Sequence, residues 1–267
     1  MRGLIDQLTD RDLTTLADVA GMSREELVEL GTHKPWRLRE LLAEDEVRDA
    51  ILNRQGHPAN AVSPMLLFGV LLASTAADLM AAKYVHDWVG PSSRLPVWDV
   101  EPLQDFVSDL GRVGFLTRLL ASFATPTPPP VPANPFDLRS MVAWLDQVEP
   151  ADRTLILRRL GDLALFLSGV FPDRTGSHPL RPIDAQRLGS SIGMTSDQIL
   201  ALCDSASLSP GLDALETLGS RWYEASSDGS EVVVRDIANR FRQARRVLNQ
   251  LADSHLYRLD LSWPAAG

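Results

Sequence analysis

The chain of 267 residues is poor in several residue types that particular classes of protein require. It contains a single cysteine, Cys203, which excludes an internal disulfide and a cysteine-rich zinc site. Its only lysines are Lys34 and Lys83, so arginine supplies nearly all of the positive charge, a bias that we expect of a bacterial protein from a GC-rich genome. The formal net charge of −9 repels phosphate, so nucleic acid is not expected as a general partner.

Motifs for nucleotide binding, nucleophilic catalysis and metal binding are missing from the sequence as well. There is no Walker loop, no Gly-x-Gly-x-x-Gly and no Gly-x-Ser-x-Gly elbow, and Cys203 resembles a small core residue. The five histidines lack the His-x-x-x-His and Glu-x-x-His spacings of helical metal sites. The sequence therefore predicts no catalytic residue and no metal site, and it indicates no cofactor. A non-enzyme is favoured, although the sequence leaves this question open.

No uninterrupted apolar run is long enough to cross a bilayer, which takes about 20 residues. The most apolar stretch, Met65 to Ala82, contains Ser74, Thr75 and Asp78, and it is expected to be a buried core helix. The N-terminal residues 1–6 lack the apolar core of a signal peptide. We therefore expect a cytoplasmic protein without a membrane partner.

Helical signals are what the sequence does contain, along most of its length. Ser23 to Glu26 form a capping box, and Ser63 and Ser209 each precede a proline suited to a first helical turn. Apolar residues recur every three to four positions, which predicts an all-α helical bundle. Helices are expected at about residues 24–30, 35–42, 64–82, 102–113, 136–148, 151–171 and 232–256, with others starting near 196 and 210, and residues 89–97 are expected to form a loop.

A proline-rich segment, Thr125 to Pro135, divides these helices into two groups. Prolines interrupt a helix because they lack an N–H donor and clash with the preceding turn, so the segment is expected to be extended. The predicted organisation is an N-terminal helical block at residues 1–124, a linker at 125–135 and a C-terminal helical block at 136–267. Whether the two blocks share one core is left open.

Asp162 is the most unusual single residue, because it lies in the otherwise apolar stretch 160–171. A buried carboxylate needs a cation or several hydrogen-bond donors, and Arg158 and Arg159 are close along the same helix. An internal ion pair is the favoured interpretation. The alternative is a ligand pocket edged by Asp162, Arg221 and His255, of which His255 continues the apolar stripe of the last helix.

Glycines at 161 and 169 lie in the same predicted helix as Asp162. Glycine destabilises a helix interior, so another element is expected to pack tightly against each of these two positions.

The last predicted helix carries a cluster of arginines. Arg235, Arg242 and Arg246 are spaced seven and four residues apart and are expected to share one helix face, which Arg240 and Arg245 would widen. Such a face can bind a carboxylate or a phosphate of a partner. The favoured interpretation, however, is that these arginines are solvated or pair internally with acidic residues such as those at 99–105, ahead of a face for a partner or for nucleic acid.

Part of the C-terminal half resembles a family of uncharacterised bacterial all-helical proteins. The resemblance is carried by Leu160-Gly-Asp162, Leu165-Phe166, Gly169-Val-Phe-Pro172 and Leu218-Gly-Ser-Arg-Trp-Tyr223, followed by the terminal helix. It covers about residues 150–256. It implies an all-helical fold and no assigned activity, so it identifies no catalytic residue.

Three functions follow as hypotheses, in order of preference. The first is a cytoplasmic, non-enzymatic interaction or regulatory protein that binds a protein partner or itself, with one or two of its six tryptophans exposed as anchors. The second is a small-molecule or cofactor-binding protein, enzymatic or not, with a pocket near Asp162, Arg221 and His255. The third is a nucleic-acid-associated regulator that uses the face of Arg235, Arg242 and Arg246.

Overall fold

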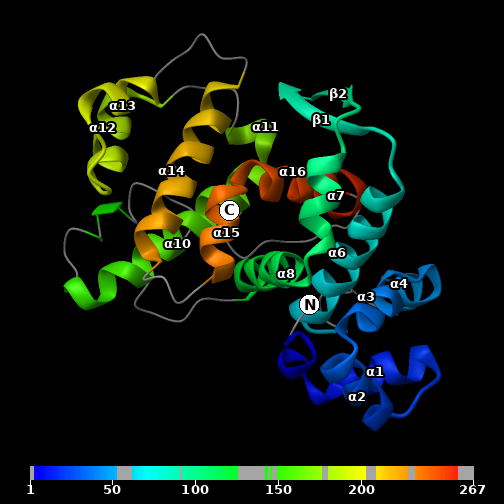
Figure 1. Ribbon diagram of the computed structural model, residues 1–267. Coiled ribbons are helices and arrows are strands. Elements are labelled where there is room, and N and C mark those ends of the chain that lie inside the picture. The colour runs from blue at the N-terminus through cyan, green and yellow to red at the C-terminus, as the bar shows by residue number, and fades with distance from the viewer. Residues whose placement is uncertain are drawn as a thin grey trace. The chain divides into compact units, whose positions relative to one another are not determined.

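The structure, a computed structural model, describes most of the chain as α-helix. The described residues are 3–52, 62–90, 92–125, 142, 143, 145, 149–175, 180–202, 209–227 and 232–257. Within them the helices are accompanied by one two-stranded hairpin, so the predicted all-α class is confirmed (Figure 1). Residues 126–135 of the predicted linker, Cys203 and nearly all of the predicted helix at 136–148 lie outside the described residues.

Contacts between Cα atoms divide the chain into two compact units, each described by itself here. The first unit comprises Met1–Val85, Trp98–Pro126 and Gln250–Ala266, and the second comprises His86–Val97, Thr127–Asn249 and Gly267. The predicted blocks at 1–124 and 136–267 differ from these units in two places: residues 86–97 group with the second unit, and residues from 250 group with the first.

Helix α6 forms the centre of the first unit. It packs against α3, α4, α7 and α8, and every residue from Leu66 to Ala76 is buried (Figure 1). By length and composition α6 could cross a membrane, but 67% of it is buried inside the fold, which is compatible with the core helix of a soluble protein. The elements of this unit are η1 (Ile5–Gln7), α1 (Asp10–Ala20), α2 (Arg24–His33), α3 (Pro35–Ala43), α4 (Asp45–Leu52), α6 (Pro64–Ala81), α7 (Glu101–Ser108) and α8 (Leu110–Ala124).

A buried carboxylate ties the start of α1 to the start of α6. Asp12 Oδ2 accepts hydrogen bonds from the backbone N–H of Thr9 (2.9 Å) and from its hydroxyl (2.7 Å). Its Oδ1 accepts from the backbone N–H of Ser63 at 2.8 Å, while the Ser63 hydroxyl caps α6. Burial by itself would raise the pKa of Asp12, but these hydrogen bonds from Ser63 and Thr9 together lower it.

Two predicted helix boundaries in the first unit are wrong. Helix α2 does not end at Gly31 but continues to His33. Gly31 is an interior helix residue that allows Ile5 to pack closely, since a Cβ at this position would lie 2.9 Å from the Ile5 side chain. The single helix expected at 102–113 is two helices. Asp109 separates them, since its side chain accepts from the N–H of Arg112 at 2.9 Å and caps the start of α8.

Two long helices of the second unit, α10 and α14, pack side by side (Figure 1). Its elements are β1 (Val85–Gly90), β2 (Ser93–Val97), α10 (Pro150–Val170), α11 (Pro172–Thr175), α12 (Pro182–Ser190), α13 (Ser196–Ala201), α14 (Pro210–Ser226), α15 (Val232–Asn239) and α16 (Phe241–Leu251). The last two residues of α16 and the turn of π-helix that follows, Ala252–Leu256, belong to the first unit.

Glycines allow the helices of the second unit to approach closely. A Cβ at Gly161 would lie 2.6 Å from the ring of Tyr223 on α14, and one at Gly169 would lie 2.6 Å from Leu248 on α16. The expectation of tight packing at both positions is therefore confirmed. A third glycine, Gly219 on α14, faces the ring of Phe241, and a Cβ there would also come within 3.0 Å of Ala164.

Residues 89–97 are not the loop that was expected but part of the β1–β2 hairpin. Asp173, just after α10, accepts hydrogen bonds from Trp88 Nε1 (2.6 Å) and from the backbone N–H of Ser92 (3.0 Å). Ser92 has a φ of 54°, in the left-handed region that non-glycine residues seldom adopt. The residue that anchors the hairpin is thus about 80 positions away along the sequence, where local patterns give no sign of it.

The single helix expected at 232–256 is also wrong, because α15 ends at Asn239 and α16 begins at Phe241. The Ser220 hydroxyl on α14 donates to the carbonyl of Ala238 at 2.9 Å. This carbonyl is thereby satisfied by α14 near the point where the chain turns between the two helices.

We predict that Asp12→Asn lowers the free energy of unfolding at pH 7 by about 2 kcal/mol, because it weakens hydrogen bonds to a buried carboxylate. Since folding lowers the pKa of Asp12, its contribution is present above the unfolded pKa of about 3.9 and is lost as the pH falls through the folded-state value. The deficit measured by denaturant unfolding should therefore shrink below about pH 5. Asp18→Asn, at an exposed position of the same helix, is the control and should change little. An equal deficit at all pH values would contradict the assignment.

We also predict that Gly219→Ala destabilises the protein, although alanine normally favours a helix by about 1 kcal/mol over glycine. The added methyl group overlaps the ring of Phe241, and overpacking costs about 1–3 kcal/mol. In a double-mutant cycle, Phe241→Leu should recover part of this loss because it removes the far edge of the ring. Additive effects of the two substitutions would show that the contact is not close.

Candidate functional site

Asp162 lies in a polar cluster between α10 and α14 in the second unit. Its Oδ1 accepts a hydrogen bond from the Tyr223 hydroxyl at 2.9 Å and pairs with Arg158 Nε at 3.3 Å. The guanidinium of Arg158 also stacks over the Tyr223 ring, 5.3 Å from its centroid. The side chain of Asp162 is 19% exposed, and the cluster satisfies it from within the fold. This geometry agrees with the favoured interpretation of an internal ion pair.

The electrostatic balance at Asp162 is set by burial. Burial raises the pKa of Asp162 above its ordinary value, although Arg158, the Tyr223 hydroxyl and Arg159 each act to lower it. The pKa of the Tyr223 hydroxyl is raised by its burial and by the neighbouring Asp162 charge. Burial also lowers the pKa of Arg159. The raised pKa of Tyr223 keeps its hydroxyl protonated, so the tyrosine is the donor and Asp162 Oδ1 the acceptor of their hydrogen bond.

The arginines of the terminal segment are divided between the interior and the surface. Arg235 and Arg242 are exposed, whereas Arg246 is buried and its Nε lies 2.9 Å from Asp87 Oδ2 on β1. The three residues therefore do not form one exposed face. Arg240 pairs with Asp236 at 3.3 Å on its own segment.

Arg245 belongs to a buried network that closes the end of α10. Its Nε contacts Glu216 Oε1 at 2.5 Å, and its guanidinium donates to Asn249 Oδ1 at 2.5 Å. Asn249 Nδ2 in turn donates to the carbonyls of Ser168 (3.1 Å) and Gly169 (2.6 Å), which lie in the last turn of α10. The acidic partners of the arginines are thus Glu216, Asp87 and Asp236 rather than the residues at 99–105.

The three residues predicted to edge a ligand pocket are not brought together within one unit. Asp162 and Arg221 lie in the second unit, and His255 lies half-buried in the π-helical turn of the first. Arg221 is two residues before Tyr223 on α14, but its side chain is exposed and lines a separate pocket beside α14. Asp162 is not among the residues that line it.

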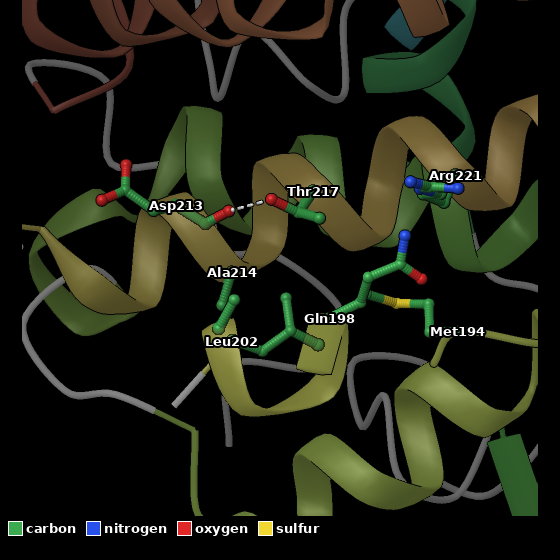
Figure 2. Close-up of a pocket in the computed structure, with 8 residues that line it drawn as sticks. Met194, Gln198, Leu202, Asp213, Ala214, Thr217 and Arg221 are labelled. Atoms are coloured by element: carbon green, nitrogen blue, oxygen red, sulfur yellow. Dashed lines mark hydrogen bonds between the residues drawn. The ribbon is translucent and has the colours of Figure 1, made fainter. Parts of the chain in front are cut away.

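This pocket beside α14 has a volume of about 170 Å³ (Figure 2). Met194, in the turn between α12 and α13, and Leu202, just after α13, form apolar wall with Ala214 of α14. The capping box of Thr195 and Gln198 fixes the start of α13, and the helix expected to start near residue 196 is thereby confirmed. The full lining is Met194, Gln198, Ala201, Leu202, Asp213, Ala214, Thr217 and Arg221.

The first unit presents a different feature, an exposed pair of aromatic rings. The rings of Tyr84 and Trp98 lie with their centroids 6.1 Å apart and are tilted by 39°. Trp98 is 69% exposed, Tyr84 48% and Met80, four residues before Tyr84, 49%. We call Tyr84 and Trp98 the aromatic patch.

Within the described residues, no group of three or more His, Cys, Asp or Glu side chains is arranged to hold a metal ion. No protein-family model matches the chain, and neither does any curated protein or solved structure. Function therefore has to be argued from the residues themselves.

The sequence did not predict all the residues that form the Asp162 cluster and the pocket beside α14. Tyr223 was not paired with Asp162, although Gly161 indicated that a bulky group would pack beside it. Arg221 was predicted to line a ligand pocket, but together with Asp162 and His255. Asp213, Thr217 and Arg221 are spaced four apart and so share a face of α14, which a helical wheel would reveal. Nothing in the local sequence indicates that α13 lies against that face.

We predict opposite pH dependences for two variants that remove a carboxylate. Because folding raises the pKa of Asp162, this group favours the folded state fully below the unfolded pKa of about 3.9 and loses that contribution as the pH rises through the folded-state value. The stability of Asp162→Asn relative to wild type should therefore rise with pH, whereas that of Asp12→Asn should fall. Asp152→Asn, exposed on the same helix, is the control for urea unfolding at pH 3 to 7. A relative stability of Asp162→Asn that declines with pH would contradict the raised pKa.

Tyr223→Phe provides the complementary test at the same cluster. It leaves Asp162 Oδ1 without the hydroxyl donor in a largely buried site, so the free energy of unfolding at pH 7 should fall by about 2 kcal/mol. The pKa of Asp162, followed by NMR titration, should move further up, because one of the interactions that lower it is gone. An unchanged Asp162 titration would show that the tyrosine does not donate to it.

Proposed function

We propose that the chain is a non-enzymatic, cytoplasmic interaction protein that binds a protein partner or a second copy of itself. The observation that carries the proposal is the exposed aromatic patch. Tryptophan and tyrosine are enriched among the residues that dominate binding energy at protein interfaces. Four of the six tryptophans are in the described part of the chain: Trp88 and Trp222 are buried, and Trp36 and Trp98 are exposed. Of the two exposed ones, Trp98 has a neighbouring aromatic ring.

The backbone that carries the patch is held in place by hydrogen bonds within the first unit. Gln104 Nε2 donates to the carbonyls of Leu79 (3.1 Å) and Ala82 (3.2 Å) at the end of α6. The carbonyl of Trp98 accepts from the N–H of Val100 at 3.0 Å, just before α7. A patch whose backbone is already ordered loses less conformational entropy on binding, which favours affinity.

Two alternative functions have weaker support. A nucleic-acid-binding face would require Arg235, Arg242 and Arg246 to be exposed together, and Arg246 is paired with Asp87 in the interior. A pocket built from Asp162, Arg221 and His255 would require a free carboxylate, whereas Asp162 already accepts from Tyr223 and pairs with Arg158. Neither observation bears on a partner bound through the aromatic patch.

The proposal predicts that Trp98→Ala weakens association about thirtyfold or more while Trp36→Ala leaves it unchanged. Truncating a central interface tryptophan costs about 2 kcal/mol or more, which is roughly a thirtyfold loss of affinity. Trp36 is the matched control, since it is also exposed but lies on α3 and has no ring partner among the described residues. Native mass measurement of the protein isolated from its own cells would report both a second copy and a different partner. A monomeric wild type that carries no partner would contradict the proposal.

A further inference from the structure

The pocket beside α14 has chemically distinct sides. The wall formed by Met194, Leu202 and Ala214 is apolar, and all three of these residues are themselves buried. The polar lining comes from α14 and from Gln198 of α13. An occupant therefore meets a hydrophobic surface and, beside it, a row of polar groups.

One end of the pocket offers hydrogen-bond donors without acceptors. The carbonyl oxygen of Gln198 accepts from the N–H of Thr195 at 3.0 Å, which leaves the amide nitrogen facing outward. Figure 2 shows this nitrogen directed toward the end of the pocket where Arg221 lies. Neither this amide nitrogen nor the Arg221 guanidinium has a partner among the residues that the structure describes. Two such donors, one of them charged, match a carboxylate.

The remaining polar lining does not oppose an anion at that end. The Thr217 hydroxyl donates to the Asp213 carbonyl at 2.9 Å, within α14. The Asp213 carboxylate points away from α13 in Figure 2, and it lies eight residues, or about 12 Å along the helix, from Arg221. The positive end is therefore well separated from the acidic one.

The size of the pocket limits what it can hold. Pockets for drug-sized ligands and cofactors measure about 300–1,000 Å³. A pocket of about 170 Å³ is smaller, and it is similar to a cavity of about 150 Å³ that accommodates benzene. It has room for one hydrophobic side chain.

We propose that this pocket binds a peptide segment of a protein partner in which one large hydrophobic residue is adjacent to an acidic residue. The hydrophobic side chain occupies the wall of Met194, Leu202 and Ala214, and the acidic side chain pairs with Arg221 and Gln198. The inference rests on the proposed function, in that the occupant is a protein, but it involves the second unit and not the aromatic patch. It names the sequence feature by which a partner is selected.

The test is a selection from a random seven-residue peptide library displayed on phage, with the full chain as bait. The recovered peptides should share a Leu, Ile, Met or Phe next to Asp or Glu. Arg221→Glu should weaken binding of a labelled recovered peptide about tenfold or more, measured by fluorescence anisotropy, because it replaces a charge-assisted pair with repulsion. Arg235→Glu is the control: it makes the same change of charge at an exposed site of α15 and should leave affinity unchanged.

A second selection with Arg221→Glu as bait should exchange the acidic position of the recovered peptides for Lys or Arg. Should that variant fail to fold by circular dichroism, Arg221→Gln is used and should weaken binding without reversing the preference. Recovered peptides without an acidic position, or equal effects of the changes at 221 and 235, would overturn the inference. Binding of free 4-methylpentanoate as tight as that of the peptide would overturn it too, since the site would then be one for small acids.

The double variant Tyr84→Ala/Trp98→Ala separates this inference from the proposed function. If it binds the recovered peptide like wild type, the pocket acts without the aromatic patch and the inference stands, whatever Trp98→Ala does to association. If it loses the peptide while Arg221→Glu does not, the peptide binds at the patch. That result would retain the proposed function and overturn the inference.

Discussion

The close approach of α10 and α14 is the constraint on which the second unit depends. Each helix contributes a glycine to this contact, Gly161 and Gly219, and each forgoes about 1 kcal/mol of helix propensity relative to alanine. Dense packing of Tyr223 and Phe241 against the bare backbone offsets that loss, since both rings are removed from water. The same contact brings the hydroxyl of Tyr223 within hydrogen-bond distance of Asp162. The close approach of the two helices therefore both packs the tyrosine ring and supplies the buried carboxyl group with a donor.

Several of the charged groups in this unit act inside the fold, and this determines which of them remain for binding. Glu216, Arg245 and Asn249 form a chain of hydrogen bonds that ends on the last carbonyls of α10, and Arg246 connects α16 to the hairpin through Asp87. An arginine in such a network cannot serve a partner without leaving its carboxylate buried and unpaired, which is costly. Arg221 differs because its side chain is exposed and lines a pocket.

The sequence predicted those parts of the fold that depend on neighbouring residues. The cap at Ser63, the helix start near residue 196 and the buried helix of 64–82 follow from local patterns, and the structure confirms them. The hairpin could not be predicted, because its anchor is the carboxylate of Asp173, which is distant in the sequence. The break after Asn239 likewise depends on Ser220 of another helix. The sequence predicted that Asp162 needs a partner. It could not identify Tyr223 as that partner, because this requires knowing that α10 packs against α14.

The amino-acid composition does not reveal which tryptophan side chains are exposed, although exposure decides which of them can bind a partner. Trp88 and Trp98 are ten residues apart, yet Trp88 is buried and donates to Asp173, and Trp98 is exposed beside Tyr84. A buried tryptophan whose N–H has found an acceptor has no further interaction to offer. An exposed one on an ordered backbone keeps its apolar area available, and covering that area releases free energy only when another molecule supplies the surface. The rings that the fold leaves uncovered therefore favour a partner, and the exposed charged residues determine which partner is chosen.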